Sequence, residues 1–186
     1  GETYYDVSGA SFRDLMAGKL AALPGERATV SDWANHASTA FPEVRLKRFI
    51  EMRGSDVGNP AMIAAQAAFW VGLLYDEASQ AAAWDIAKNW NACDREGLRA
   101  TVPRLGLAAR IAGRSLGAVA AEALTIARAG LATRARRDAQ GRDETHFLQP
   151  LEAIVAAGRS LAEERLAAYE GRWQRSVEPT FTECVF

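Results

Sequence analysis

The chain has 186 residues, 49% of them hydrophobic, which is enough to bury a sizeable core in one large domain or in part of one. Its formal net charge of -1 and its sequence pI of about 6.2 argue against nucleic acid or an anionic membrane as the main partner. No uninterrupted apolar run is long enough to cross a bilayer, and only two cysteines are present, so we expect a soluble, cytoplasmic protein with neither a disulfide scaffold nor structural zinc.

Residues 2–7 are rich in aromatic side chains and predict a strand at the very start of the chain. This strand begins abruptly, with no methionine and no residues leading into it. We therefore expect the start of the chain to be a cut edge of a longer protein.

Residues 44–53 alternate in chemical character with a period of two, which is typical of a strand. One set consists of Val44, Leu46, Arg48, Ile50 and Met52, and the other of Arg45, Lys47, Phe49, Glu51 and Arg53. Residues two apart on a strand share a face. Lys47, Glu51 and Arg53 are therefore expected to point the same way, with Arg45 on the same face.

The charged face of this predicted strand has two interpretations. Glu51 could hold a hard cation while Arg53 holds a phosphate or carboxylate, which is the pairing that a magnesium-nucleotide site requires. Alternatively, the face is solvated and carries a cross-strand ion pair, as half-exposed sheets often do. Residue spacing leaves both interpretations open.

From residue 59 onward the sequence predicts helices. Asn59 is a suitable N-cap, and Pro60 follows at the first helical position, where its missing N–H costs nothing. Further helices are predicted over residues 77–90 and 116–134, and Ser160 and Glu163 form a capping box for a last helix that Gly171 closes. No linker or repeat divides the chain, so we expect a single portion of one domain, in which residues 1–58 supply strands and short helices and residues 59–186 a helical layer.

Three other groups of residues have both a functional and a structural interpretation. His36 could contact a substrate, but a histidine near the end of a short helix is more often a capping or packing residue. Phe69, Trp70 and Tyr75 could line a pocket for a small thiol, although core packing is the commoner use of such side chains. The basic cluster that follows the long helix is interleaved with acidic residues and indicates a solvated helix end: Arg128, Arg134, Arg136, Arg137 and Arg142.

Familiar enzyme motifs are missing from the sequence. It contains neither a G-x-x-x-x-G-K-[ST] loop nor a G-x-G-x-x-G turn, so a Walker-type or Rossmann nucleotide site is excluded. It also lacks a G-x-S-x-G elbow and a cysteine with a suitable histidine partner, so hydrolase chemistry is unsupported. A site on a sheet that uses magnesium, acidic residues and arginine remains open.

Several ordered blocks of the sequence point to one known family. The longest runs from Asp32-Trp33 through Asn35-His36 and Thr39 to Phe41-Pro-Glu-Val-Arg-Leu-Lys-Arg-Phe-Ile-Glu-Met-Arg-Gly54 and Asp56. The others are residues 5–12, 16–20, 23–26, 69–76, 102–107, 169–173 and 176–181. These blocks resemble the C-terminal half of glutamate-cysteine ligase of the plant and proteobacterial type, and they extend over nearly the whole chain.

This resemblance implies an α+β fold, mainly helical, that forms the C-terminal part of a glutamine-synthetase-like antiparallel sheet with a helical covering layer. The N-terminal half, which this chain is expected to lack, would carry much of the sheet and most of the acidic metal ligands, and would be a partner of this chain. The implied reaction is the ATP- and magnesium-dependent ligation of L-glutamate to L-cysteine through a γ-glutamyl phosphate, which is the first step of glutathione biosynthesis.

The same resemblance implies roles for four residues. Glu51 is expected to be a magnesium ligand that bridges to ATP oxygens, and Arg53 the catalytic donor to the phosphates of ATP or to the acyl phosphate. Arg45 and Lys47 are expected to add positive potential for ATP binding. The expected partners are the substrates glutamate, cysteine and ATP, and neither nucleic acid nor a membrane. An alternative from another class is a non-catalytic helical interaction or regulatory module, in which the Glu51 and Arg53 pair is structural.

Overall fold

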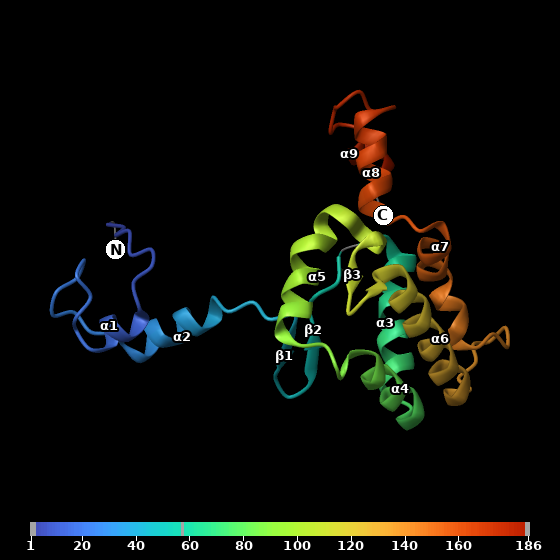
Figure 1. Ribbon diagram of the computed structural model, residues 1–186, viewed down its shortest axis with the longest axis horizontal. Coiled ribbons are helices and arrows are strands. Elements are labelled where there is room, and N and C mark those ends of the chain that lie inside the picture. The colour runs from blue at the N-terminus through green and yellow to red at the C-terminus, as the bar shows by residue number, and fades with distance from the viewer. Residues whose placement is uncertain (1–2, 57, 185–186) are drawn as a thin grey trace. The chain divides into compact units, whose positions relative to one another are not determined.

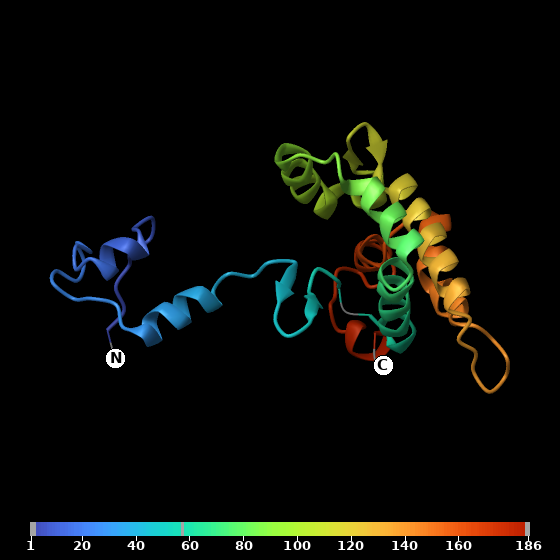
Figure 2. The ribbon, with the colours of Figure 1, turned by 90° about the horizontal axis from the view of Figure 1, so that it is seen from below.

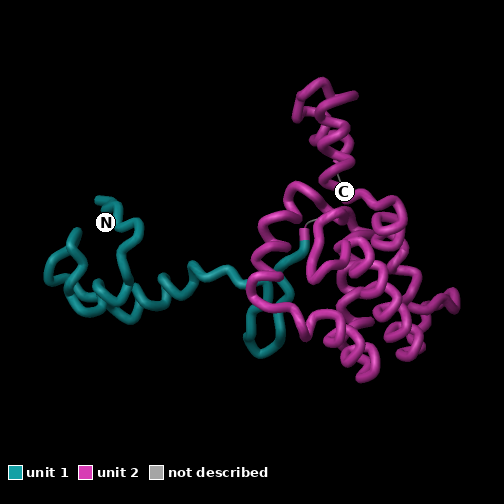
Figure 3. Tube along the Cα trace, in the orientation of Figure 1, with its two compact units in different colours: residues 1–55 teal, residues 56–186 magenta. Residues whose placement is uncertain are grey.

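The computed structural model describes residues 3–56 and 58–184 (Figure 1). The chain divides into two compact units, Gly1–Ser55 and Asp56–Phe186 (Figure 3). The described residues are mostly helical, with two small antiparallel sheets of two strands each, in agreement with the α+β class expected from the sequence. The boundary between the units lies close to residue 58, where the sequence changes from strand to helix patterns.

The first unit contains two short helices and a β-hairpin: α1 (Phe12–Met16), α2 (Val30–Ser38), β1 (Val44–Leu46) and β2 (Ile50–Met52). Helix α2 begins at a capping box in which Thr29 and Asp32 accept each other's backbone N–H groups. The His36 ring stacks on Phe12 with 4.1 Å between ring centroids, so His36 packs within the unit. Residues 3–7 have no regular secondary structure, so the predicted strand is wrong there, and residue 2 lies outside the described residues.

The predicted strand over residues 44–53 is instead a hairpin. Strands β1 and β2 pair antiparallel, and residues 47–49 connect them, with the Lys47 N–H donating to the Phe49 carbonyl oxygen at 2.9 Å. The chemical alternation continues through this connection, which carries none of the Gly, Pro, Asn or Asp residues that mark most turns. For that reason the sequence pattern runs over both strands and their turn without a visible break.

The second unit is built mainly from helices. Its elements are α3 (Pro60–Leu74), α4 (Glu77–Ala87), α5 (Ala92–Leu105), η1 (Gly106–Ala108), β3 (Arg110–Ile111), β4 (Arg114–Ser115), α6 (Leu116–Arg134), η2 (Glu144–Leu148), α7 (Gln149–Ala157), α8 (Leu161–Glu170) and α9 (Thr180–Glu183). Three predicted helices are confirmed, because the Asn59 side chain caps α3, α6 has the predicted bounds, and Ser160 and Glu163 open α8. The helix predicted over residues 77–90 ends at Ala87, and α5 and the β3–β4 hairpin have no counterpart among the predicted elements.

The core of the second unit lies where α3, α6 and η2 meet. Figure 2 shows α3 and α6 running side by side. The buried side chains of this core are Ala68, Leu73, Leu124, Ala127, Leu131 and Leu148. Phe69 and Trp70 pack against it, whereas Tyr75 is 71% exposed. The core-packing interpretation therefore holds for two members of the predicted aromatic set.

Helices α3 and α6 approach each other through two buried glycines. A Cβ atom on Gly72 would overlap the Ala127 carbonyl group, and one on Gly130 would overlap the Gly72 carbonyl oxygen. The Ser79 hydroxyl also lies 2.9 Å from the position of a Gly130 Cβ. The contact between the two helix backbones therefore requires that both positions lack a side chain.

Helix α6 is the one described helix that is long and apolar enough to cross a membrane, with a mean hydropathy of 1.2 over its most apolar window, of which 28% is buried. This is a statement about length and composition alone, since the core helix of a soluble protein passes the same test. The helix carries Glu122 and Arg128, so it is not an uninterrupted apolar run. Its side chains Leu124 and Leu131 belong to the core described above.

We expect Gly72→Ala and Gly130→Ala to lower the free energy of unfolding, because the added methyl group forces the two helix backbones apart. Overpacking of this kind typically costs about 1–3 kcal/mol, which exceeds the gain in helix propensity of about 1 kcal/mol that alanine brings. Thermal unfolding followed by circular dichroism measures the change. The matched control is Gly97→Ala in α5, where a Cβ meets no atom within 4 Å and should leave the melting temperature unchanged or raise it. A Gly72 variant as stable as the parent would contradict the close contact.

Candidate functional site

The charged residues singled out in the sequence lie on the β1–β2 hairpin of the first unit (Figure 1). The strand register pairs Arg45 with Glu51, Val44 with Met52, and Leu46 with Ile50. Because cross-strand partners share a face and neighbouring pairs alternate, one face of the hairpin is charged and the other is apolar. The hairpin therefore separates the groups that can bind a polar ligand from the groups that need to be covered.

On the charged face, the Arg45 Nε donates a hydrogen bond to the Glu51 Oε2 at 2.7 Å. This bond is the main reason why the pKa of Glu51 lies below its ordinary value; desolvation opposes it, and the charges of Arg45, Lys47 and Arg53 lower the pKa further. Glu51 is therefore ionised at neutral pH. The contact is the cross-strand ion pair of the alternative interpretation, and because both side chains are partly exposed it adds little to stability.

Arg53 lies two residues after Glu51 and belongs to the same face. Its backbone N–H donates to the Glu43 carbonyl oxygen at 2.7 Å. Its guanidinium lies over the Phe41 ring, with 5.5 Å between the Cζ atom and the ring centroid. The Arg53 Nη1 is buried and has no hydrogen-bond partner within the described part of the chain. Leaving such a donor unpaired is costly, so this N–H suits a ligand oxygen.

Lys47 lies in the connection between the strands, where its side chain is exposed and its charge acts on Glu51. The hairpin thus brings all four predicted site residues into one small area, with Arg45 contacting Glu51 directly. Phe41 is absent from the predicted site, although it contacts Arg53. The alternation of positions 41, 43 and 45 on an extended segment is the sequence signal that could have indicated this shared face.

The donor set of this face can be compared with what a magnesium ion requires. The described residues contain no group of three or more His, Cys, Asp or Glu side chains that could hold a metal ion. A magnesium ion bound with a nucleotide needs only one or two protein carboxylates, because phosphate oxygens and water complete its shell. Glu51 is such a donor, and the unpartnered Nη1 of Arg53 suits a phosphate oxygen. The residues of this face fit a magnesium-nucleotide complex, whereas the described residues by themselves do not provide the ligands of a complete metal site.

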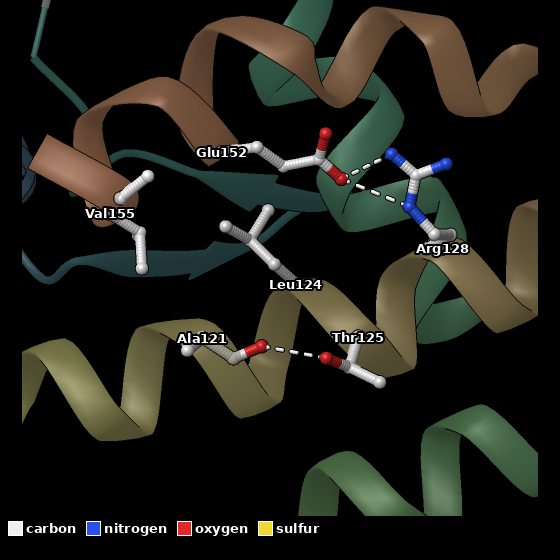
Figure 4. Close-up of a pocket in the computed structure, with 7 residues that line it drawn as sticks. Ala121, Leu124, Thr125, Arg128, Glu152 and Val155 are labelled. Atoms are coloured by element: carbon white, nitrogen blue, oxygen red, sulfur yellow. Dashed lines mark hydrogen bonds and ion pairs between the residues drawn. The ribbon is translucent and has the colours of Figure 1, made fainter.

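Figure 4 shows a second candidate, a cavity of about 260 Å³ beside α6 and α7. It is lined by Ala121, Leu124, Thr125, Arg128, Glu152, Val155 and Ala156. The Arg128 Nε donates to the Glu152 Oε1 at 3.0 Å, and the Thr125 hydroxyl donates to the Ala121 carbonyl oxygen at 3.0 Å. The polar groups of the lining are thus directed at one another, and the remaining wall is apolar. This arrangement offers no chemistry of its own.

The basic cluster that follows α6 is also ion-paired. The Arg134 Nε donates to the Glu144 Oε2 at 3.0 Å, and the Arg142 Nε donates to the Asp138 Oδ2 at 2.8 Å. Together with the pair of Arg128 with Glu152, these contacts agree with the solvated helix end expected from the sequence. The β1–β2 hairpin therefore remains the candidate site.

Residues 3–183 match the sequence model of glutamate-cysteine ligase family 2. Over 183 residues the chain is 44% identical to the chloroplastic glutamate–cysteine ligase of Nicotiana tabacum, covering 98% of this chain and 34% of that protein. It is also 44% identical to the chloroplastic glutamate–cysteine ligase A of Oryza sativa subsp. indica, covering 98% and 36% of the two chains. The chloroplastic glutamate–cysteine ligase of Arabidopsis thaliana is 43% identical, and the match covers 98% of this chain and 34% of that protein.

The chain spans about a third of the length of these relatives. Their names contradict the expectation of a cytoplasmic protein, since all three relatives are named chloroplastic. Charge and apolar content describe how a folded protein interacts with water, and they carry no information about its compartment. The match over residues 3–183 establishes that this chain belongs to glutamate-cysteine ligase family 2.

Proposed function

We propose that this chain supplies part of the active site of an ATP-dependent ligase that joins the γ-carboxylate of L-glutamate to the amino group of L-cysteine. The observation that carries the proposal is the charged face of the hairpin, where an ionised Glu51 lies among cations and Arg53 keeps a buried N–H without a partner among the described residues. Glu51 pairs with Arg45, which leaves the Arg53 Nη1 unengaged. The relatives are named glutamate–cysteine ligases, which supports the ligation of these two amino acids.

In the proposed reaction, an oxygen of the glutamate γ-carboxylate attacks the terminal phosphorus of ATP, ADP leaves, and γ-glutamyl phosphate forms. The amino group of cysteine then attacks the acyl carbon, loses a proton and displaces phosphate. Catalysis of such a transfer rests on positioning and on neutralising the charge of the moving phosphoryl group. Magnesium, when bound, would neutralise part of the charge on the ATP oxygens.

Each residue of the charged face has a separate role in the proposed reaction. Glu51 would hold magnesium through its carboxylate, and Arg53 would donate hydrogen bonds to the transferred phosphoryl group. Arg45 keeps Glu51 ionised and oriented through the 2.7 Å hydrogen bond. Lys47 adds positive potential where the phosphates of ATP would lie.

The rest of the active site lies outside this chain in the proposed enzyme. The apolar face of the hairpin exposes Val44, Leu46 and Ile50 by 49%, 82% and 63%. A single two-stranded hairpin is marginally stable in water, so such a face needs further strands or a covering layer. We propose that an N-terminal half of the enzyme supplies them within a glutamine-synthetase-like antiparallel sheet, together with further acidic metal ligands.

Substitution of Glu51 and Arg53 tests these roles in the complete enzyme. Glu51→Gln keeps the shape of the side chain but removes a charged oxygen ligand, so half-maximal activity should require more magnesium. Arg53→Lys keeps the charge but loses the forked donor geometry, so turnover should fall by about two orders of magnitude or more. Rates of phosphate release at varied magnesium and ATP concentrations measure both changes.

The matched controls are Glu170→Gln and Arg136→Lys, the same substitutions at exposed positions of the second unit. Both should leave the rate and its magnesium dependence unchanged. Unaltered kinetics in the Glu51 and Arg53 variants would return the charges of the hairpin to a structural role.

The chain on its own should be inactive, because the described residues contain no group of three or more His, Cys, Asp or Glu side chains that could hold a metal ion and leave the apolar face of the hairpin exposed. Incubated with ATP, magnesium, glutamate and cysteine, the purified chain of 186 residues should release no phosphate above background. Addition of the N-terminal half as a separate polypeptide should restore turnover. Robust turnover by the chain alone would overturn the proposed division of the active site.

A further inference from the structure

An aromatic side chain, Phe41, reaches the charged face of the β1–β2 hairpin. The backbone bond between Arg53 and Glu43 continues the strand ladder beyond β1 and β2, and Phe41 lies two residues before Glu43. The Arg53 Cζ lies 5.5 Å from the centroid of the Phe41 ring. Arg53 is half-buried, while Phe41 is 72% exposed. An exposed aromatic ring therefore supports the guanidinium of the candidate phosphate donor.

The backbone fixes both partners of this contact. Phe41 precedes Pro42, and a proline ring disfavours helical conformations of the residue before it. Arg53 is tied to Glu43 by the 2.7 Å hydrogen bond between their backbones. The ring and the guanidinium thus lie at neighbouring positions on two paired segments.

An aromatic ring holds a guanidinium without using any of its hydrogen-bond donors. The attraction acts through the face of the ring, and the N–H groups of the guanidinium stay available for a ligand. A carboxylate in the same place would engage these donors, as Glu51 engages the Nε of Arg45. The Arg53 Nη1 has no hydrogen-bond partner within residues 3–56 and 58–184, so its N–H groups are not used by other protein groups.

We propose that Phe41 is the positioning residue for Arg53, holding its guanidinium so that Nη1 donates to a phosphate oxygen of the bound nucleotide. The inference rests on the proposed function, in which Arg53 contacts the phosphates of ATP. Phe41 acts through Arg53 and touches neither the phosphates nor the magnesium ligand. Loss of the ring therefore weakens nucleotide binding and leaves the magnesium dependence set by Glu51 unchanged.

Isothermal titration of the complete enzyme with magnesium-ATP, without glutamate and cysteine, measures nucleotide binding separately from turnover. Phe41→Leu should weaken binding by about two- to fivefold, the range expected for loss of one exposed cation–π contact. Phe41→Tyr keeps the ring and should bind like the parent. The matched control is Phe49→Leu in the hairpin connection, 62% exposed, which should bind ATP normally. Thermal unfolding checks that each variant is folded, and Phe41→Met replaces the leucine variant if that one unfolds.

A double-mutant cycle separates a positioning role from a merely structural one. In the Arg53→Gln background, Phe41→Leu should cause no further loss of ATP affinity, because the group that Phe41 positions is gone. An equal loss in both backgrounds would overturn the proposal, as would a normal affinity of Phe41→Leu beside a weakened Arg53→Gln. Unchanged ATP affinity of Arg53→Gln itself would instead overturn the proposed function of Arg53, on which the inference rests.

Discussion

The pairing of Arg45 with Glu51 across the β1–β2 hairpin decides which side chains of the candidate site lie together. In this register the charged pair alternates with apolar pairs, so every charged residue of the strands faces one way. A shift of one residue would turn Arg45 toward the apolar face and would leave the Glu51 carboxylate without its cation. Keeping the apolar side chains together on one face and keeping Arg45 beside Glu51 on the other thus require the same strand register.

The two units differ in how far they bury their own apolar side chains. In the second unit, Leu131 and Leu148 are fully buried in a core built from its own helices. In the first unit Leu20 is buried, whereas Val30 and Trp33 are 85% and 54% exposed. Extended apolar surface is typical of an interaction site. The first unit, which carries the candidate site, therefore exposes apolar side chains that the proposed enzyme would need to cover.

Local signals predicted the helices well, because a cap and the helix it opens lie within a few residues, as Asn59 does for α3. Helix α5 was not predicted, although the capping box of Asn91 and Asp94 marks its start and Pro103 lies in its last turn. Strand predictions fared worse, since a strand forms only beside a partner. The aromatic residues 3–7 have no such partner among the described residues, and the alternation over residues 44–53 does not show where the chain turns back.

The same physical limit applies to the candidate site. The two-residue spacing of Glu51 and Arg53 predicts that they share a face of the strand. Which cation contacts Glu51 depends on where the chain turns back, and residue spacing does not locate that turn. Arg45 is predicted to bind ATP, and in the structure its Nε donates a hydrogen bond to Glu51 and thereby orients the Glu51 carboxylate. The positive charges of Arg45, Lys47 and Arg53 surround the Glu51 carboxylate and weaken its attraction for a free divalent cation. The same charges attract the phosphates of a magnesium-ATP complex. In the proposed enzyme, Glu51 would therefore bind magnesium as the complex that the ion forms with ATP.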